Sequence, residues 1–481
     1  MNYTSFAFFV MLLVILIAYY IINKKYRWTV LLLGSAFFYI HIITSLKQAA
    51  IFLMSIIITY ITGLLLQKTK ILSDKKVRIV ILWAGILFAG MPLFITKVGE
   101  FITGSIIHND KVFWITPVGV SFYTLQMIAY IVDIYRDKID AQKNILKFML
   151  FATFFPQIIQ GPIPRYKEIS NELFEGNDYS FNNIIRGIQL IIWGFFLKMM
   201  IADKSGIIVN TIFDNYPVYQ GTYIWVAAFL YSIQLYTDFL SCTTISQGVS
   251  EMFGIHLANN FVHPYLATSI KDFWRRWHIS LSLWLRDYVY IPLGGSKHGN
   301  IKKWFNLIIT FLISGLWHGG RWKYLVWGMV HASIQIIEDI AKILKIKIIK
   351  TQNNNIEKVV NRIKTFFVVM FAWIIFRAES LRMSISMIKS MLFVFNPWVL
   401  FDDSLLKLGL NWKEWAVLFV SIGVLIYISR LQENGIIIRN WILKQNVIVR
   451  WGIYLMAIWG IWIMGTYGYG FNSNEFIYGG F

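Results

Sequence analysis

Cysteine is almost absent from this chain, and so are several catalytic motifs that can be recognised from sequence. The single cysteine among the 481 residues is Cys242. One thiol cannot form an intrachain disulfide, a cysteine cluster for zinc or iron–sulfur, or a dithiol redox pair. The sequence also has no G-x-x-x-x-G-K-[ST] loop, no G-x-S-x-G elbow and no H-E-x-x-H motif. We therefore expect no metal and no bound cofactor.

Charged residues are scarce, and acidic residues are the scarcer kind. Only 15% of the residues are charged, 57% are hydrophobic, and the mean hydropathy is +0.57. This composition does not suit a water-facing surface and predicts a membrane protein. The 45 Lys and Arg against 25 Asp and Glu give 45 − 25 = +20. In a membrane protein, that excess marks loops beside the cytoplasmic leaflet, so the expected partner is the lipid bilayer and not nucleic acid.

Basic loops predict how the chain is oriented in the cell membrane. Ser5–Ile22 is apolar and long enough to span, and Asn23–Arg27, which follows at once, carries three cations. A signal peptide has the reverse order, so we expect an uncleaved first helix with an extracytoplasmic N-terminus. Two further basic loops, Lys68–Arg78 and Lys342–Lys364, are expected to be cytoplasmic.

The apolar runs predict an all-α polytopic fold. Candidate spans are Ser5–Ile22, Trp28–Ile43, Ala49–Leu66, Ile79–Ile95, Val112–Val132, Ile184–Ile201, Tyr223–Leu240, Phe305–Trp317, Tyr324–Ile337, Lys364–Phe376, Ser386–Val399, Trp415–Ile428 and Val449–Thr466. Because several are short, we expect about 11–12 crossings plus interfacial pieces. After Phe148–Ile159, two prolines and a glycine in Gln160–Arg165 predict a re-entrant segment or one that lines an enclosed cavity.

We expect one integral membrane domain over 1–481. Its N-terminal transmembrane helices occupy 1–110, its catalytic core 115–335 and its C-terminal transmembrane helices 336–481. There is no internal repeat at a fixed period, which weakens a transporter built from inverted repeats.

Tryptophan and histidine concentrate where a lipid-facing helix would avoid them. Thr268–Gln335 holds seven of the 20 Trp and four of the eight His. At 100° per residue, Phe273–Tyr288 forms one helix with an aromatic stripe beside a polar face, and His278 lies at their border. The stripe contains Trp274, Trp277, Leu281, Trp284, Leu285 and Tyr288, and the polar face contains Arg275, Ser282 and Arg286.

Two interpretations of this basic helix remain open and are compatible. An interfacial helix uses Trp and Arg as anchors at headgroup level. Alternatively, the basic face binds an anionic cosubstrate, because Arg binds phosphate in a bidentate manner. Lys271–Lys303 has seven Lys or Arg against Asp272 and Asp287. That excess suits a donor with several phosphates.

His318 is the second feature, in Ser314–Gly320 at the end of an apolar run. An ionisable residue in a spanning segment is a functional-site hypothesis, and the neighbouring glycines let another backbone or a substrate come close. The alternative is a neutral core histidine that donates to a carbonyl. His331 lies thirteen residues on, and Gly319–Gly320 breaks the helix between the two. Asp238 could pair with a cation or orient a histidine, and Cys242 is expected to be a packing residue.

At this point the sequence resembles the membrane-bound O-acyltransferase superfamily, in its bacterial alginate O-acetylase-like branch. Five blocks carry the likeness: Pro117–Gln126, Phe155–Gln157 with Gly161–Pro162, Asn260–Ser269, Asp272–Ser296 and Gly315–Gly319. The resemblance implies a helical shell around a central funnel, with a thioester donor entering from the cytoplasm and the acceptor from outside. It also implies that His318 is catalytic and that His278 matches the second polar residue of the family.

The expected activity is O-acetylation of an extracytoplasmic polysaccharide. Acetyl-CoA would be the cosubstrate, His318 the general base, and His278 would orient the acceptor or donate to the thioester oxyanion. Arg275 and Arg286 would hold the donor phosphates, with His331, Asp238, Ser282 and Trp317 as possible supporting residues. By family analogy, the acetyl group reaches the glycan through a serine of an extracytoplasmic acetyltransferase partner protein.

Three alternatives remain at this stage. A D-alanyltransferase of the same fold would modify teichoic acid from a carrier-bound thioester. A lipid O-acyltransferase would need an apolar lateral entrance. A polysaccharide exporter would explain the polytopic body without chemistry and would not need His318.

Overall fold

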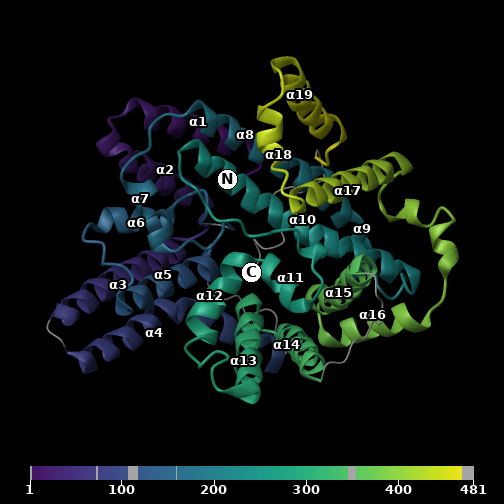
Figure 1. Ribbon diagram of the computed structural model, residues 1–481, viewed down its shortest axis with the longest axis horizontal. Helices are drawn as coiled ribbons and strands as arrows, with labels where there is room; N and C mark the ends of the chain where they lie inside the picture. The colour runs from purple at the N-terminus through teal and green to yellow at the C-terminus, as the bar shows by residue number, and fades with distance from the viewer. Residues whose placement is uncertain (1–2, 72–73, 107–116, 159, 345–353, 468–481) are drawn as a thin grey trace.

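The computed structural model describes residues 3–71, 74–106, 117–158, 160–344 and 354–467, and this part of the chain contains helices and no strand (Figure 1). The helices are α1 (Phe6–Ile21), α2 (Arg27–Ile42), α3 (Leu46–Ile71), α4 (Lys75–Glu100), η2 (Phe101–Ile106), α5 (Val120–Tyr135), α6 (Ile145–Thr153), α7 (Tyr166–Phe174), α8 (Phe181–Phe195), η3 (Phe196–Ala202), α9 (Asp203–Asp214), α10 (Thr222–Met252), α11 (Ile270–Arg276), α12 (Ile279–Leu285), η5 (Arg286–Tyr290), α13 (Gly299–His318), α14 (Trp322–Ile343), α15 (Asn354–Arg377), α16 (Leu381–Phe393), α17 (Trp412–Glu433), α18 (Ile438–Leu443) and α19 (Val447–Met464). Short 3-10 turns are η1 (Lys24–Tyr26), η4 (Pro264–Leu266), η6 (Pro397–Leu400) and η7 (Leu405–Leu408).

Polar residues at the ends of the apolar runs fix where several helices begin. The side chains of Ser5, Ser180 and Ser380 accept hydrogen bonds from backbone N–H groups in the first turns of α1, α8 and α16. Asn411 and Glu414 form a reciprocal capping box at the start of α17. These bonds satisfy N–H groups that have no partner inside the helix, so each helix begins at a defined residue.

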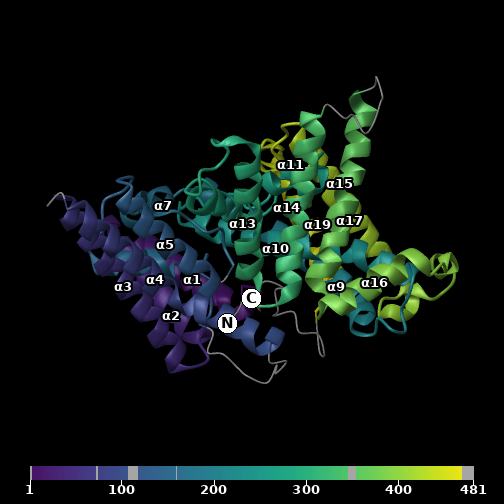
Figure 2. The ribbon, with the colours of Figure 1, turned by 90° about the horizontal axis from the view of Figure 1, so that it is seen from below.

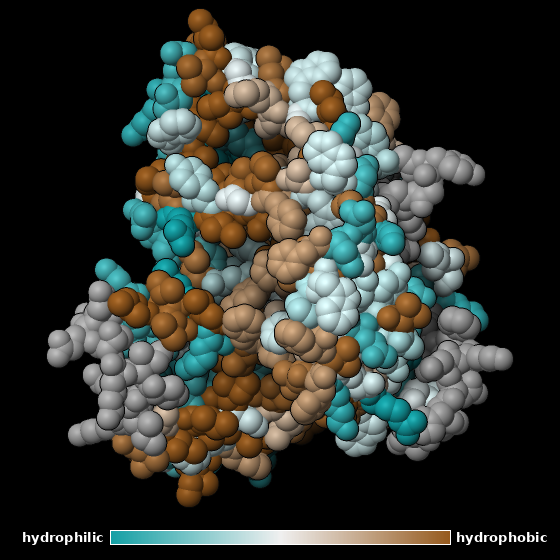
Figure 3. Space-filling model, turned by 90° about the vertical axis from the view of Figure 1, so that its right-hand side faces the viewer, coloured by the Kyte–Doolittle hydropathy of each residue, from teal (hydrophilic) through white to brown (hydrophobic). Residues whose placement is uncertain are grey.

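Length and composition confirm an all-α polytopic membrane protein. Within the described residues, six helices are long and apolar enough to cross a membrane: 46–71, 75–104, 181–214, 355–377, 412–433 and 447–464. Two shorter apolar helices, 6–21 and 120–135, add to them. On the face seen in Figure 3, hydrophobic residues run from the upper to the lower edge. Such a surface suits hydrocarbon, and the number of 11–12 crossings stays a prediction.

The helices form a middle and two flanks. Figure 2 shows α10, α11, α13 and α14 between the N-terminal helices α1–α5 on one side and α15–α17 on the other. The long helix α10 joins two hydrophobic cores, because Leu235 packs in the core with α15 and Val249 packs in the core with α1–α6. A Cβ at Gly187 of α8 would lie 2.5 Å from the carbonyl oxygen of Gly248 in α10. Small residues therefore let these two helices touch through their backbones.

The Pro- and Gly-containing segment after α6 is enclosed by protein, as predicted. Phe155, Gln157 and Gly161 are all buried. The backbone N–H of Phe155 donates to Ser35 Oγ (3.2 Å), and the hydroxyl of Tyr3 donates to the Phe155 carbonyl (2.9 Å). Side chains from α2 and from the N-terminal end thus replace the hydrogen bonds that a helix would make internally, which is how irregular backbone is tolerated at membrane depth.

The prediction of one continuous helix over Phe273–Tyr288 is wrong. The helix α11 ends at Arg276, His278 has a left-handed φ of +43°, and α12 starts at Ile279. The break is held by a distant loop, because the N–H of Ile279 donates to the carbonyl of Asn260 (2.9 Å). As a result the expected aromatic stripe divides between two cores: Trp277 joins the core around α10, and Trp284 joins a smaller one against α5.

Candidate active site

His318 is the last residue of α13 and follows a close contact between α13 and α14. A Cβ at Gly315 would lie 2.4 Å from the carbonyl oxygen of Tyr324, and one at Gly328 would lie 2.4 Å from the carbonyl oxygen of Phe311. Glycine is therefore required at both positions for the two helices to pack this tightly. The neighbouring glycines were expected to let another backbone come close. At Gly315 that backbone belongs to α14, and this contact fixes the position of His318.

His318 and His278 are buried in one aromatic cluster. Their exposed fractions are 2% and 1%. The ring of His318 lies 4.8 Å from Trp317, 5.2 Å from Trp327 and 5.2 Å from Phe376, measured between centroids. The ring of His278 lies 5.9 Å from the same Trp317. The structure thus brings together the two histidines that the sequence singles out, since both rings pack on Trp317.

Trp317 is fixed between the two histidines by a hydrogen bond. Its Nε1–H donates to the carbonyl of Ser121 at 3.0 Å, and Ser121 belongs to the first turn of α5. On the other side of His278, the ring of Phe239 packs edge-on at 4.7 Å. Residues from α5, α10, α13 and the turn between α11 and α12 therefore meet at this point, although they are far apart in the sequence.

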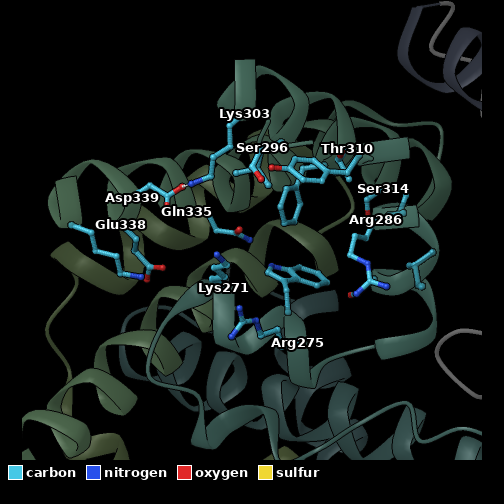
Figure 4. A pocket seen from close by; sticks show the side chains of 18 residues that line it. Lys271, Arg275, Arg286, Ser296, Lys303, Thr310, Ser314, Gln335, Glu338 and Asp339 are labelled. Atoms are coloured by element: carbon cyan, nitrogen blue, oxygen red, sulfur yellow. Dashed lines mark ion pairs between the residues drawn. The ribbon is translucent and has the colours of Figure 1, made fainter. Parts of the chain in front are cut away.

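A cavity of about 430 Å³ opens beside this cluster, between α11, η5, α13 and α14 (Figure 4). Arg275, Arg286 and Ser282 line it, as the sequence analysis expected for the donor-binding face. Sequence reasoning did not place three further cations that also line it: Lys271, Lys303 and Lys342. Lys271 and Lys303 fall in the basic segment noted above, whereas Lys342 was assigned to a loop. The packing of α14 against both α13 and α11 brings them together.

One face of α13 leads from the cavity to His318. The residues of α13 that line the cavity are Lys303, Leu307, Thr310, Phe311 and Ser314, which recur every three or four positions. The next position on that face is His318, because residues four apart lie one above the other on a helix. Leu281 of α12 also lines the cavity, and it lies three residues after His278. The cavity therefore ends about one helical turn from each histidine.

Positive charge exceeds negative charge around the cavity. Lys303 forms an ion pair with Asp339 (2.5 Å), which Figure 4 draws as a dashed line. Arg286 forms one with Asp287 (2.7 Å), which lies outside the lining. In the part of the chain that the structure describes, Lys271, Arg275 and Lys342 have no ion-pair partner. Three of the five cations are thus uncompensated and available to an anionic ligand.

Asp287 anchors the rim of this cavity. It accepts from Arg165 at 2.7 Å as well as from Arg286, and Tyr288 donates to Asp133 at 2.8 Å. Burial favours a raised pKa for Asp287, but the hydrogen bond from Arg286 and the charge of Arg165 outweigh it and hold that pKa below its usual range. The carboxylate stays ionised and ties η5 to the segment that follows α6.

The other predicted residues take supporting positions. Asp238 pairs with Lys198 at 2.7 Å, and Lys198 also pairs with Asp203 at 2.9 Å, all three being buried. This confirms the cation-pairing interpretation of Asp238. Ser282 donates to the carbonyl of Trp277 at 3.2 Å. Cys242 is buried in the core, as expected of a packing residue.

The ring of Trp327 packs against both His331 and His318. The rings of His331 and Trp327 are 5.0 Å apart, and those of Trp327 and His318 are 5.2 Å apart. His331 accepts a hydrogen bond at Nδ1 from Trp274 Nε1–H at 3.3 Å. Among the described residues, no three His, Cys, Asp or Glu side chains lie close enough to hold one metal ion.

Comparison with known proteins gives a consistent result. A profile of the MBOAT, membrane-bound O-acyltransferase, family matches residues 136–388. The chain is 31% identical to a probable alginate O-acetylase of Pseudomonas fluorescens, over 87% of this chain and 80% of the relative. It is 31% identical to a peptidoglycan O-acetyltransferase of Helicobacter pylori, over 75% and 73%. A teichoic acid D-alanyltransferase of Bacillus subtilis is 26% identical over 78% of this chain and 98% of the relative.

Proposed function

The chain belongs to the membrane-bound O-acyltransferase family, and from that premise we propose that it moves an acetyl group from cytoplasmic acetyl-CoA to an extracytoplasmic polysaccharide. The observation that carries this proposal is the face of α13, which runs from a basic cavity to the buried His318. One helix thereby connects the cavity for a charged donor with an apolar site for the reaction. The relatives named as a probable alginate O-acetylase and a peptidoglycan O-acetyltransferase support the choice of acetyl and of a glycan acceptor.

The basic cavity supports a donor that carries several phosphates. The cations Lys271, Arg275, Arg286, Lys303 and Lys342 face the carboxylates Glu338 and Asp339, which gives 5 − 2 = +3. We assign the donor phosphates to Arg275 and Arg286, because guanidinium groups bind phosphate oxygens in pairs. Acetyl-CoA is then a cosubstrate that enters and leaves, and not a bound cofactor.

His318 acts as the general base in the proposed mechanism. It takes the proton from the acceptor hydroxyl, whose oxygen attacks the thioester carbonyl carbon. His278 orients the acceptor or donates to the oxyanion that develops. The intermediate collapses as the carbon–sulfur bond breaks, and His318 returns its proton to the thiolate, so the products are an ester and the free thiol of CoA. General base catalysis of this kind contributes typically about 10² to 10⁴ in rate, and a fixed donor to an oxyanion about 10² to 10³.

The orientation supports transfer across the cell membrane. We infer an extracytoplasmic N-terminus, because the basic residues after α1, at the end of α3 and at the end of α14 mark cytoplasmic ends. The basic cavity then faces the cytoplasm, since Lys342 lies on its rim. The acceptor side is extracytoplasmic, and a serine of a partner acetyltransferase there is the proposed carrier to the polysaccharide.

Replacing the proposed base tests this function. Vesicles that contain the wild-type protein should transfer label from acetyl-CoA, whereas His318→Ala should lose at least about 10²-fold in rate while it stays folded and inserted. The matched control is His256→Ala, because His256 is exposed and its ring pairs with Glu172. Full transfer by the His318→Ala protein would refute the catalytic assignment.

D-alanyl transfer to teichoic acid is the second candidate, favoured by the match to the Bacillus subtilis D-alanyltransferase, which covers 98% of that relative. Its donor would be a thioester on a carrier protein. Offering purified protein both free acetyl-CoA and a D-alanyl carrier thioester separates the two candidates, since only the true donor should support transfer.

The lipid acyltransferase and exporter alternatives are less well supported. An apolar crevice of about 770 Å³ lies between α8, α17, α18 and α19, but it shares no lining residue with the basic cavity. A lipid-soluble labelled product would favour the lipid acyltransferase. Glycan export that persists in the His318→Ala protein, without any acyl transfer by the wild type, would favour the exporter.

A further inference from the structure

An indole ring forms part of the wall of the basic cavity. Trp274 of α11 lines the cavity together with Phe311, Leu281 and Ser314. Phe311, Leu281 and Ser314 are themselves buried. Ser314 and Leu281 lie one turn before His318 and after His278, so an acyl group that reaches the histidines must pass this set of side chains.

The indole of Trp274 cannot move away from the cavity, because it packs against buried rings. Its ring centroid lies 5.4 Å from Phe311, 5.6 Å from Trp327 and 5.0 Å from His331. Trp327 and His331 are both 0% exposed. Aromatic rings at these spacings are in van der Waals contact, and a close-packed interior leaves no room for the indole to move back.

His331 holds the indole in one orientation. The Nε1–H of Trp274 donates to Nδ1 of His331 at 3.3 Å. Indole can only donate, so Nδ1 of His331 is the acceptor and carries no proton. Turning the indole would break this hydrogen bond and leave its N–H without that partner, which is unfavourable. The hydrogen bond therefore favours the rotamer in which the ring lines the cavity.

The space beyond Trp274 is also crowded by rings. His318 is surrounded by Trp317, Trp327 and Phe376 at centroid distances of 4.8–5.2 Å. Trp327 stacks on Trp373 at 5.9 Å with an interplanar angle of 19°. An acyl group beside His318 thus meets aromatic walls within a few methylene lengths. The geometry sets a size limit on the acyl group.

We propose that Trp274 is the residue that restricts the transferred acyl group to a short chain, and that His331 is the positioning residue that holds Trp274 in place. This inference rests on the proposed function, since it concerns the acyl part of the same thioester donor. It gives Trp274 and His331 a role in specificity that is separate from the chemistry at His318.

The ratio of transfer rates with two donors tests the inference. Purified protein in vesicles is offered acetyl-CoA or butyryl-CoA, and kcat/KM is measured for each. Two extra methylenes in a tight apolar site discriminate by about 10-fold or more each, so the wild type should prefer acetyl by on the order of 10²-fold. Trp274→Ala should reduce this preference at least about tenfold, because the space of the indole becomes available to the longer chain.

Two His331 variants separate positioning from general packing. His331→Phe keeps a ring of similar size but removes the acceptor, so the acetyl preference should fall in the same direction as in Trp274→Ala. His331→Gln can accept from the indole N–H and should keep a preference close to that of the wild type. The ratio does not depend on the amount of folded protein, so a merely structural defect would lower both rates equally and leave it unchanged.

Trp284→Ala is the matched control, because Trp284 lies outside the cavity lining and donates instead to the carbonyl of Leu125. Its acetyl preference should equal that of the wild type. An unchanged preference in Trp274→Ala, with wild-type acetyl transfer intact, would overturn the size limit alone. A wild type that transfers neither acyl group would refute the donor assignment, and this inference with it.

Discussion

His278 combines a proposed chemical role with an unusual backbone conformation. Its φ of +43° is left-handed, which costs an ordinary residue roughly 1–2 kcal/mol. The surrounding loop compensates, since the carbonyl of Asn260 accepts from Ile279 N–H and the side chain of Asn260 accepts from Ser280 N–H at 3.0 Å. The turn between α11 and α12 aims the ring at Trp317 and Phe239.

Substitutions at His278 should separate the backbone from the ring. His278→Ala and His278→Gly both remove the imidazole, so each should lower acetyl transfer by about 10²-fold or more. His278→Gly should unfold at a higher temperature than His278→Ala, because glycine adopts a positive φ without the steric cost. Thermal unfolding followed by tryptophan fluorescence gives the order of stability. Wild-type activity in either variant would remove His278 from the mechanism.

At the level of elements, the contact between α13 and α14 sets where His318 lies. The two helices run side by side, and backbone atoms of α14 occupy the space where a side chain at Gly315 would be. His318 follows Gly315 by three residues, at the end of α13. The face of α13 that lines the cavity therefore depends on the distance between these helices.

A single methyl group should disturb this contact. In Gly315→Ala the Cβ would lie 2.4 Å from the Tyr324 carbonyl oxygen, so α13 has to move away from α14. We expect a loss of about 10²-fold in acetyl transfer, since a displacement of about 1 Å at the reacting groups has that effect, and a loss of about 1–3 kcal/mol in stability.

The matched control for this change is Gly452→Ala. Gly452 lies on α19, and no atom lies within 4 Å of a Cβ built there. Activity should stay at the wild-type level, and stability should stay the same or rise slightly. Equal activities in the Gly315→Ala and Gly452→Ala proteins would show that the helix contact does not position the site.

At the scale of the whole molecule, the single buried cysteine makes the orientation measurable. Cys242 is 0% exposed and should not react with a reagent in water. In a Lys76→Cys variant the new thiol lies in the first turn of α4, and in a Phe401→Cys variant it replaces a side chain that is 86% exposed after α16. A membrane-impermeant maleimide on intact cells should label the Phe401→Cys protein but not the Lys76→Cys protein until the cells are opened. The reverse pattern would invert the proposed topology.

Hydropathy and proline placement predicted the helical body well, because in lipid every span must satisfy its backbone hydrogen bonds internally. The candidate span 28–43 corresponds to α2 at 27–42, and Val449–Thr466 to α19 at 447–464. The enclosed segment Gln160–Arg165 was also predicted. The break at His278 was not, because the backbone atoms that hold it belong to Asn260, eighteen residues away.

The sequence indicated candidate site residues but not the extent of the cavity. His318 stood out because an ionisable residue in an apolar run is costly, and Arg275 and Arg286 because they share one face of the helix expected there. Lys342 could not be placed in the cavity, since that requires knowing how α14 pairs with α13. In the same way, nothing in the spacing of His331 indicates that it accepts from Trp274, a residue 57 positions earlier.

The buried ion pairs of Lys198 also bear on how the chain enters the membrane during synthesis. Lys198 lies in the continuous helical stretch of α8, η3 and α9, where Asp203 already compensates its charge. Asp238 arrives 40 residues later in α10, and its carboxylate would be costly to leave in lipid alone. The cation it needs is held by the helix that was inserted before it. We therefore expect α10 to leave the translocon packed against α8 and α9. The three helices then enter the lipid as one assembled unit.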